Sequence, residues 1–179
     1  MTPALRIRAS VLKALIVLAT VSATQIPAQA SQTTIVAIDG VLCDLTRTLV
    51  ATDAKVICLI QPGNDPHNYR LRPSDRQALN NATLVLHNGF NLTRSANKIS
   101  GSAKVMAVAE KALPANDGSD PHVWHDPAKS AAMVVVIADR LEPVLAATQR
   151  SALAARAAAA ITVLNAVGDW GTKQFATIP

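Results

Sequence analysis

Short aliphatic runs constrain the fold of this chain more than any other feature. They cover residues 33–38, 54–60, 83–86 and 104–108, and loops or helical patterns separate them. A run that is apolar along its length fits a strand buried on both faces, as in parallel sheets. Strands that alternate with helices are typical of βαβ units with right-handed crossovers. We therefore predict an α/β fold in which flanking helices cover a parallel sheet.

The composition and the helical patterns agree with that fold. Hydrophobic residues make up 50% of the chain but aromatic residues only 3%, so the core must be aliphatic. Asp126 before Pro127 is typical of an N-cap with proline at the first helical position. We expect Ser74 to cap a short helix that begins near Pro73. Further helices are predicted over residues 41–50, 128–141 and 148–170.

The first thirty residues have the features of a secretory signal. Basic residues precede a short apolar run over residues 14–23, and Ala28-Gln29-Ala30 forms a small-x-small cleavage site. The sequence thus predicts export to the periplasm through a cleavable signal peptide, residues 1–30. An uncleaved anchor is the alternative, although the run is short for a bilayer. The exported part divides into an α/β lobe over residues 31–147 and a long helical segment over residues 148–179.

The charge balance argues against nucleic acid as a partner. The chain has 17 Lys and Arg against 12 Asp and Glu, a net charge of +5. Removal of residues 1–30 takes away Arg6, Arg8 and Lys13 but no acid, which leaves 14 bases and a net charge of +2. A strongly basic domain is the electrostatic footprint of nucleic-acid binding, and the exported part is not one.

Cys43 and Cys58 are the only cysteines. An even number in an exported chain permits one disulfide. Both residues lie within apolar runs, which equally suits buried free thiols. The sequence leaves both alternatives open.

Two of the four histidines follow an Asp-Pro step, in Asp65-Pro66-His67 and Asp120-Pro121-His122. Loops at the carboxyl ends of parallel strands converge on one crevice, so these two imidazoles could share a transition metal such as zinc or manganese. Proline restricts itself and the residue before it, which limits the freedom of each turn. Asp65 and Asp120 are candidates for orienting the rings or for binding the metal.

The other two histidines are weaker candidates. His125 stands three residues after His122, but the flanking prolines argue against a regular helix that would align the two rings. We expect His125 in a loop near the next helix, as a possible additional ligand. His87 ends the third aliphatic run, where we expect an exposed side chain that could line the same crevice.

Four motifs follow one another along the chain: residues 63–69 (GNDPHNY), 73–75 (PSD), 88–92 (NGFNL) and 120–124 (DPHVW). In this order they resemble the zinc/manganese-type solute-binding proteins of bacterial ABC transporters. The resemblance spans essentially the whole chain after residue 30. It implies the N-terminal lobe of a two-lobe protein that captures a divalent metal ion, then a linking helix and the start of a second lobe. It implies His67 and His122 as metal ligands, whereas the position of His125 is not a ligand in the family.

The chain also departs from this family's pattern. Arg70 and Thr93 stand where glutamate is frequent, and the loop over residues 114–119 lacks a histidine-rich insertion. The family's other two ligands lie in the second lobe. We therefore expect this sequence to be the N-terminal half, from either a fragment or a truncated gene.

No sequence motif indicates catalysis. The chain has no G-x-S-x-G, H-E-x-x-H, C-x-x-C or phosphate-loop motif. We predict a monomeric protein that is not an enzyme and that delivers its metal ion to a membrane permease. The alternatives are an exported metal-dependent hydrolase and a non-binding remnant or adhesion module of the same fold.

Overall fold

The computed structural model describes residues 32–99 and 104–178. These residues make up most of the predicted α/β lobe and of the long helical segment after it. The predicted signal peptide, residues 1–30, lies outside the described residues.

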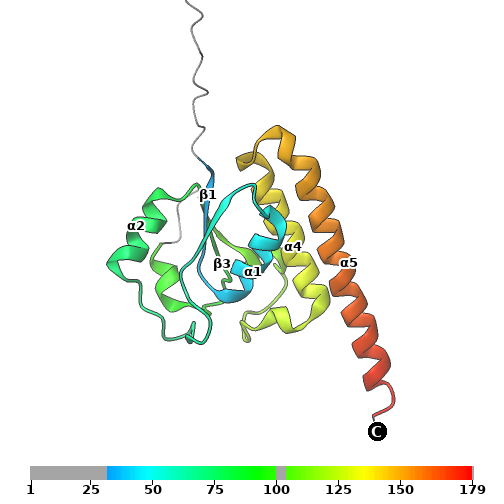
Figure 1. Ribbon diagram of the computed structural model, residues 1–179. Coiled ribbons are helices and arrows are strands. Elements are labelled where there is room, and N and C mark those ends of the chain that lie inside the picture. Colours follow the sequence, from blue (N-terminus) through cyan, green and yellow to red (C-terminus); the bar gives the residue numbers. More distant parts are fainter. Residues whose placement is uncertain (1–31, 100–103, 179) are drawn as a thin grey trace, which may run out of the picture. The chain divides into compact units, whose positions relative to one another are not determined.

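Four parallel strands form the centre of the fold, as predicted (Figure 1). Their order in the sheet is β2-β1-β3-β4, so β1 and β3 are interior. Because all four strands run the same way, their carboxyl ends meet at one edge of the sheet. The strands are β1 (Thr34–Ala37), β2 (Lys55–Cys58), β3 (Leu84–His87) and β4 (Val105–Ala107).

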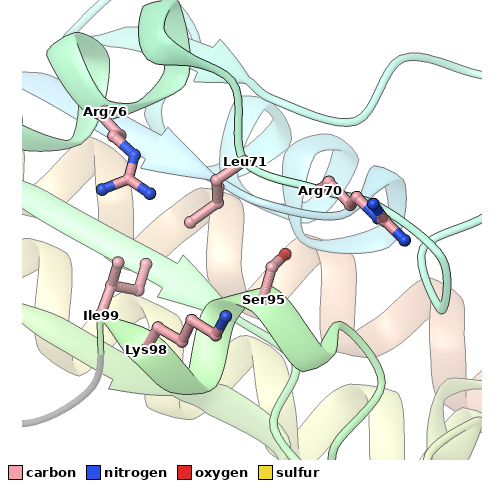
Figure 2. Close-up of a pocket in the computed structure, with 6 residues that line it drawn as sticks. All are labelled: Arg70, Leu71, Arg76, Ser95, Lys98 and Ile99. Atoms are coloured by element: carbon pink, nitrogen blue, oxygen red, sulfur yellow. The ribbon is translucent and has the colours of Figure 1, made fainter.

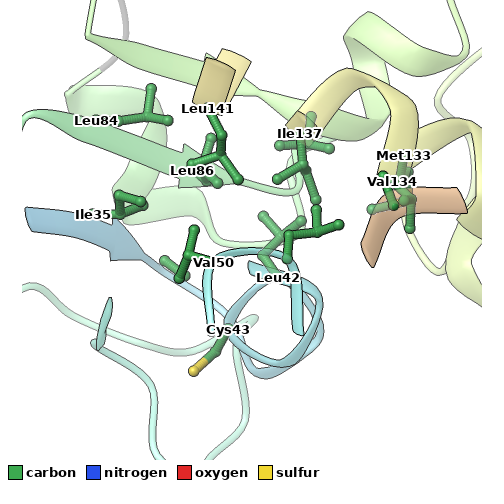
Figure 3. Close-up of a cluster of buried hydrophobic side chains, with 14 of the residues drawn as sticks. Ile35, Leu42, Cys43, Val50, Leu84, Leu86, Met133, Val134, Ile137 and Leu141 are labelled. Carbon is green, nitrogen blue, oxygen red and sulfur yellow. The ribbon is translucent and has the colours of Figure 1, made fainter. Parts of the chain in front are cut away.

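Helices cover both faces of this sheet. On one face, α1, α3, α4 and the first half of α5 pack over alternate residues of β1 and β3. Figure 3 shows Ile35, Leu84 and Leu86 of the strands facing Ile137 and Leu141 of α4. On the other face, α2 and η1 cover a smaller cluster. The elements are α1 (Gly40–Val50), α2 (Pro73–Asn81), η1 (Arg94–Lys98), α3 (Val108–Ala112), η2 (Val123–His125), α4 (Pro127–Leu141), η3 (Glu142–Val144), η4 (Ala147–Gln149) and α5 (Arg150–Phe175).

One of the two predicted helix N-caps is confirmed, and the other is wrong. Asp126 caps α4 as predicted, since its Oδ1 accepts a hydrogen bond from the Ala128 N–H at 2.9 Å. The prediction of Ser74 as the cap of α2 is wrong. Arg72 is the N-cap residue, and the Asp75 carboxylate accepts from its backbone N–H at 2.7 Å. An acid three residues into the helix satisfies an amide that would otherwise lack a partner.

The long helix α5 is buried only in its first half. Leu153 and Ala157 pack into the core, and Arg156 donates from Nε to the Leu49 carbonyl at 2.6 Å. Val167 and Trp170 further along are at least half exposed. The stretch Ala147–Phe175 is long and apolar enough to cross a membrane, but a single helix of this kind is weak support for a span.

Cys43 and Cys58 form a disulfide across 15 residues, with their Cα atoms 5.6 Å apart. The bond joins α1 to the end of β2. It settles the alternative left open by the sequence, and it fits an oxidising compartment.

Candidate metal centre

The two Asp-Pro-His turns meet at the carboxyl edge of the sheet. His67 lies in the loop after β2, and His122 lies in the loop between α3 and η2. Their Nε2 atoms are 3.0 Å apart, although the residues are 55 positions apart in sequence. Two nitrogen ligands on a tetrahedral zinc ion would lie about 3.3 Å apart. The pair is therefore close to the separation at which one ion can bind both rings.

Both turns share one hydrogen bond from the aspartate side chain to the histidine backbone. Asp65 Oδ1 accepts from the His67 N–H at 2.9 Å, and Asp120 Oδ1 accepts from the His122 N–H at 2.9 Å. The intervening proline has no N–H, so the histidine amide is the first donor that the aspartate can reach. These hydrogen bonds are the leading cause of the lowered pKa of each carboxyl group. Both aspartates therefore stay ionised near neutral pH.

The two aspartates differ in the other side chains with which they form hydrogen bonds. Asp120 Oδ1 also lies 2.7 Å from His122 Nδ1. An ionised carboxylate can only accept, so Nδ1 is the protonated nitrogen and Nε2 of a neutral ring keeps its lone pair for a metal. Asp65 instead accepts from Asn68 Nδ2 at 2.7 Å through its other oxygen. Among the contacts of the described residues, no hydrogen bond joins Asp65 to the His67 ring.

A buried polar chain supports the second turn. Asn88, just after β3, donates from Nδ2 to the Pro121 carbonyl at 3.0 Å and from its backbone N–H to Asp39 Oδ2 at 3.2 Å. Asp39 also caps α1 through the Leu42 N–H. Asn88 is 1% and Asp39 3% exposed, and burial raises the pKa of Asp39 to about 6. The ends of β1 and β3 are thus tied to the loop that carries His122.

A separate set of contacts supports the first turn. The Tyr69 hydroxyl donates to Asp75 Oδ2 at 2.8 Å, and the Ser95 hydroxyl donates to the Tyr69 carbonyl at 2.9 Å. Desolvation, followed by the hydrogen bond to Asp75, raises the pKa of Tyr69 to about 12. The loop that carries His67 is therefore fastened to α2 and to η1.

The remaining histidines lie apart from the Nε2 pair. His125 is exposed on η2, with its ring 6.4 Å from that of His122 between centroids. The expectation that His87 is exposed is wrong, because β3 is interior and leaves only 6% of His87 accessible. Burial lowers the pKa of His87, against the opposing effect of Glu110. Within residues 32–99 and 104–178, no group of three or more His, Cys, Asp or Glu side chains is placed to hold a metal.

Residues 35–179 match the family model described as ZnuA, zinc-uptake complex component A, periplasmic. The chain belongs to this family. The resemblance inferred from the motifs is thereby confirmed. The matched relatives are named as metal-binding and metal-uptake proteins rather than as enzymes, in agreement with the prediction that this protein is not an enzyme.

Curated relatives of ZnuA type match over different lengths. The zinc-binding protein TroA of Treponema pallidum is 34% identical over 97 residues, which cover 49% of this chain and 32% of TroA. The manganese-binding lipoprotein MntA of Halalkalibacterium halodurans is 30% identical over 150 residues, or 78% of this chain and 49% of MntA. The chain thus spans half or less of the length of these relatives.

Solved structures agree on the fold. The periplasmic zinc-binding protein TroA of Treponema pallidum superposes with a TM-score of 0.74 at 24% identity, over 83% of this chain and 57% of that one. The Fe(III)-bound YtgA of Chlamydia trachomatis gives a TM-score of 0.73 at 22% identity, over 82% and 55% of the two chains. The predicted α/β fold with flanking helices and a long C-terminal helix is that of the TroA-like solute-binding proteins.

Proposed function

We propose that this chain supplies half of a binding site for a divalent transition metal ion, zinc or manganese, in the solute-binding component of an ABC importer. The observation that supports the proposal is the 3.0 Å separation of His67 Nε2 and His122 Nε2. The metal ion is the transported substrate, and not a resident cofactor. Imidazole suits zinc and other first-row transition metals, and additional oxygen ligands would favour manganese.

In this proposal the two turns have different tasks. Asp120 holds the His122 ring with Nε2 directed at the ion, and Asp65 holds the backbone of the first turn while the His67 ring adjusts. His125 does not bind the metal ion in this proposal. The remaining ligands of a closed four-ligand site come from outside the described residues, from solvent or from an anion.

The proposal extends to the setting of the protein. Residues 1–30 act as a cleavable signal peptide for export to the periplasm, and residues 31–147 form the metal-binding lobe. Residues 148–179 form the linking helix and the beginning of a second lobe. The exported protein acts as a monomer that passes the ion to a membrane permease, and it has no nucleic-acid partner. Membership of the ZnuA family and the names of the relatives support this setting.

Alanine substitutions test the metal site directly. Zinc and manganese are titrated into the wild-type chain and into the His67→Ala, His122→Ala and His125→Ala variants by calorimetry. We expect at least about tenfold weaker binding for the first two, because each loses one of two imidazole ligands, and no more than a small change for His125→Ala. Equal effects at all three positions would argue against the proposed site.

The affinity of the wild-type chain is a second test. We expect a dissociation constant at or above about 1 μM for zinc, which corresponds to about 8 kcal/mol. Four-ligand structural zinc sites reach about 10–16 kcal/mol. Submicromolar binding by these 179 residues would refute the idea of half a site.

A further inference from the structure

A concave basic surface lies beside the first turn. Two adjoining hollows of about 420 and 330 Å³ share Arg70, Ser95 and Lys98 in their walls. The first also contains Arg76 and the second Arg94. Figure 2 shows Arg70, Leu71 and Arg76 on one wall, and Ser95, Lys98 and Ile99 on the other. We refer to the surface formed by Arg70, Arg76, Arg94 and Lys98 as the basic groove.

The basic groove carries several positive charges and has no acidic partner among the described residues. In the part of the chain that the structure describes, none of its four cations forms a salt bridge, and no carboxylate lines either hollow. The nearby acid Asp75 is engaged with Tyr69 and with the backbone of Arg72. A cleft lined by charges of one sign concentrates the field and attracts counter-ions.

The basic groove is also held in shape. The Ser95 hydroxyl joins η1, which carries Arg94 and Lys98, to the Tyr69 carbonyl next to Arg70. Leu71 and Ile99 pack against the smaller core cluster beneath it. The backbone of both walls is therefore held by hydrogen bonding and burial, while the four cationic side chains are exposed and can reach a ligand.

We propose that the basic groove binds a small oxyanion with two or more negative charges, of the polycarboxylate or polyphosphate class. Hollows of about 300–1,000 Å³ suit small molecules, and arginine pairs with carboxylate and phosphate oxygens through two parallel hydrogen bonds. Four cations in the walls match a multivalent anion better than a monovalent one.

The position of the basic groove connects it to the metal. His67 lines the second hollow together with Arg70 and Arg94, so an anion bound there lies beside one of the two proposed metal ligands. Carboxylate oxygens bind the same ions as imidazole. Resting on the proposed function, the anion then supplies oxygen ligands that complete the coordination started by His67 and His122.

Calorimetry tests the anion site independently of the metal. The full 179-residue chain is freed of metal by dialysis against a chelating resin, and citrate, pyrophosphate and acetate are titrated at low ionic strength. We expect saturable binding of citrate or pyrophosphate with half-saturation below about 1 mM, and no saturable binding of acetate. Vesicles that contain phosphatidylglycerol are titrated in parallel. Absence of binding by both multivalent anions would overturn the proposal, even if the vesicles bind.

Matched charge variants locate the binding. Arg70→Glu/Arg94→Glu should weaken it at least about tenfold, whereas Lys55→Glu/Lys173→Glu makes the same change of net charge on exposed residues elsewhere and should leave it nearly unchanged. Circular dichroism verifies that both variants fold. Equal weakening in the two double variants would overturn the proposal.

The failure of each proposal is distinguishable. His122→Ala changes a residue that lines neither hollow, so it should keep the anion binding and weaken the metal binding. Anion binding without metal binding in the wild-type chain would overturn the metal site alone. Metal binding without anion binding would overturn the basic groove alone.

Discussion

The two Asp-Pro-His turns are identical in sequence but are held differently. In the second turn, Asp120 fixes both the backbone and the ring of His122, and Asn88 fixes the Pro121 carbonyl from the buried side. In the first turn, Asp65 fixes only the backbone of His67 and uses its other oxygen for Asn68. The second turn therefore presents a preorganised ligand, and the first an adjustable one.

The proposed function requires both binding and release of an ion, and this difference between the turns bears on both. A ring held by a carboxylate has a defined tautomer and orientation, which favours metal binding. A ring without that constraint can move by the few tenths of an ångström that separate the 3.0 Å pair from the about 3.3 Å spacing around an ion. We therefore expect changes at the second turn to have the larger effects.

The largest effect is expected from pH, through the support of the second turn. Asp39 has its pKa raised by burial from the ordinary 3.8 to about 6. Between these values the unfolded chain binds fewer protons than the folded one, so the free energy of unfolding falls as pH rises from about 4 to about 6. The total loss is about 3 kcal/mol, at about 1.36 kcal/mol for each pKa unit.

Urea unfolding followed over about pH 3.5–7 measures this fall, and the carboxyl chemical shift of Asp39 locates its titration in the folded protein. Asp39→Asn should remove this part of the pH dependence. A midpoint for Asp39 near its ordinary value of 3.8 would contradict the role of burial, whatever the stability of the variant.

The next effect separates the two aspartates. Asp120→Asn weakens the hold on the His122 ring and should reduce metal affinity about 10–100-fold. Asp65→Asn keeps an oxygen that can accept from the His67 N–H, so its effect should stay within about threefold. Metal titration gives both values, and the nitrogen shifts of His122 report whether Nδ1 remains protonated. Equal losses of metal affinity in the two variants would contradict the claim that the two aspartates have different roles.

A third effect concerns the hydrogen bonds behind each turn. Asn88→Ala leaves the Pro121 carbonyl without its buried donor and should lower the free energy of unfolding by about 1–3 kcal/mol. Ser95→Ala removes one hydrogen bond to the Tyr69 carbonyl and should lower it by about 0.5–1.5 kcal/mol. Chemical unfolding measures both variants. A larger loss of unfolding free energy for Ser95→Ala than for Asn88→Ala would contradict the claim that the second turn is the more firmly held.

Much of the fold could be predicted because its signals are local. The aliphatic runs became parallel strands, and Asp126-Pro127 became a helix start. The cap of α2 was missed because Ser74 and Asp75 are neighbouring polar residues, and only the hydrogen bond to Arg72 distinguishes their roles. His87 was misplaced because a strand's own sequence does not tell whether it is interior or at an edge.

The candidate site was predictable in part for the same reason. The repeated triplets pointed to His67 and His122, since strand ends converge in a parallel sheet. The role of Asn88 was not predictable, because its partner Pro121 lies 33 residues away and no local pattern marks the contact. The different surroundings of Asp65 and Asp120 also depend on long-range packing and on the side chain of Asn68.

The most direct test of the proposed metal site is X-ray absorption at the zinc edge of the zinc-loaded chain. We expect two imidazole nitrogens at about 2.0–2.1 Å from the ion, with oxygen atoms as the remaining ligands. His67→Ala and His122→Ala should each remove one imidazole, and the double variant should remove both. A spectrum of the double variant that still shows two imidazoles would contradict the claim that the two Asp-Pro-His turns bind the metal.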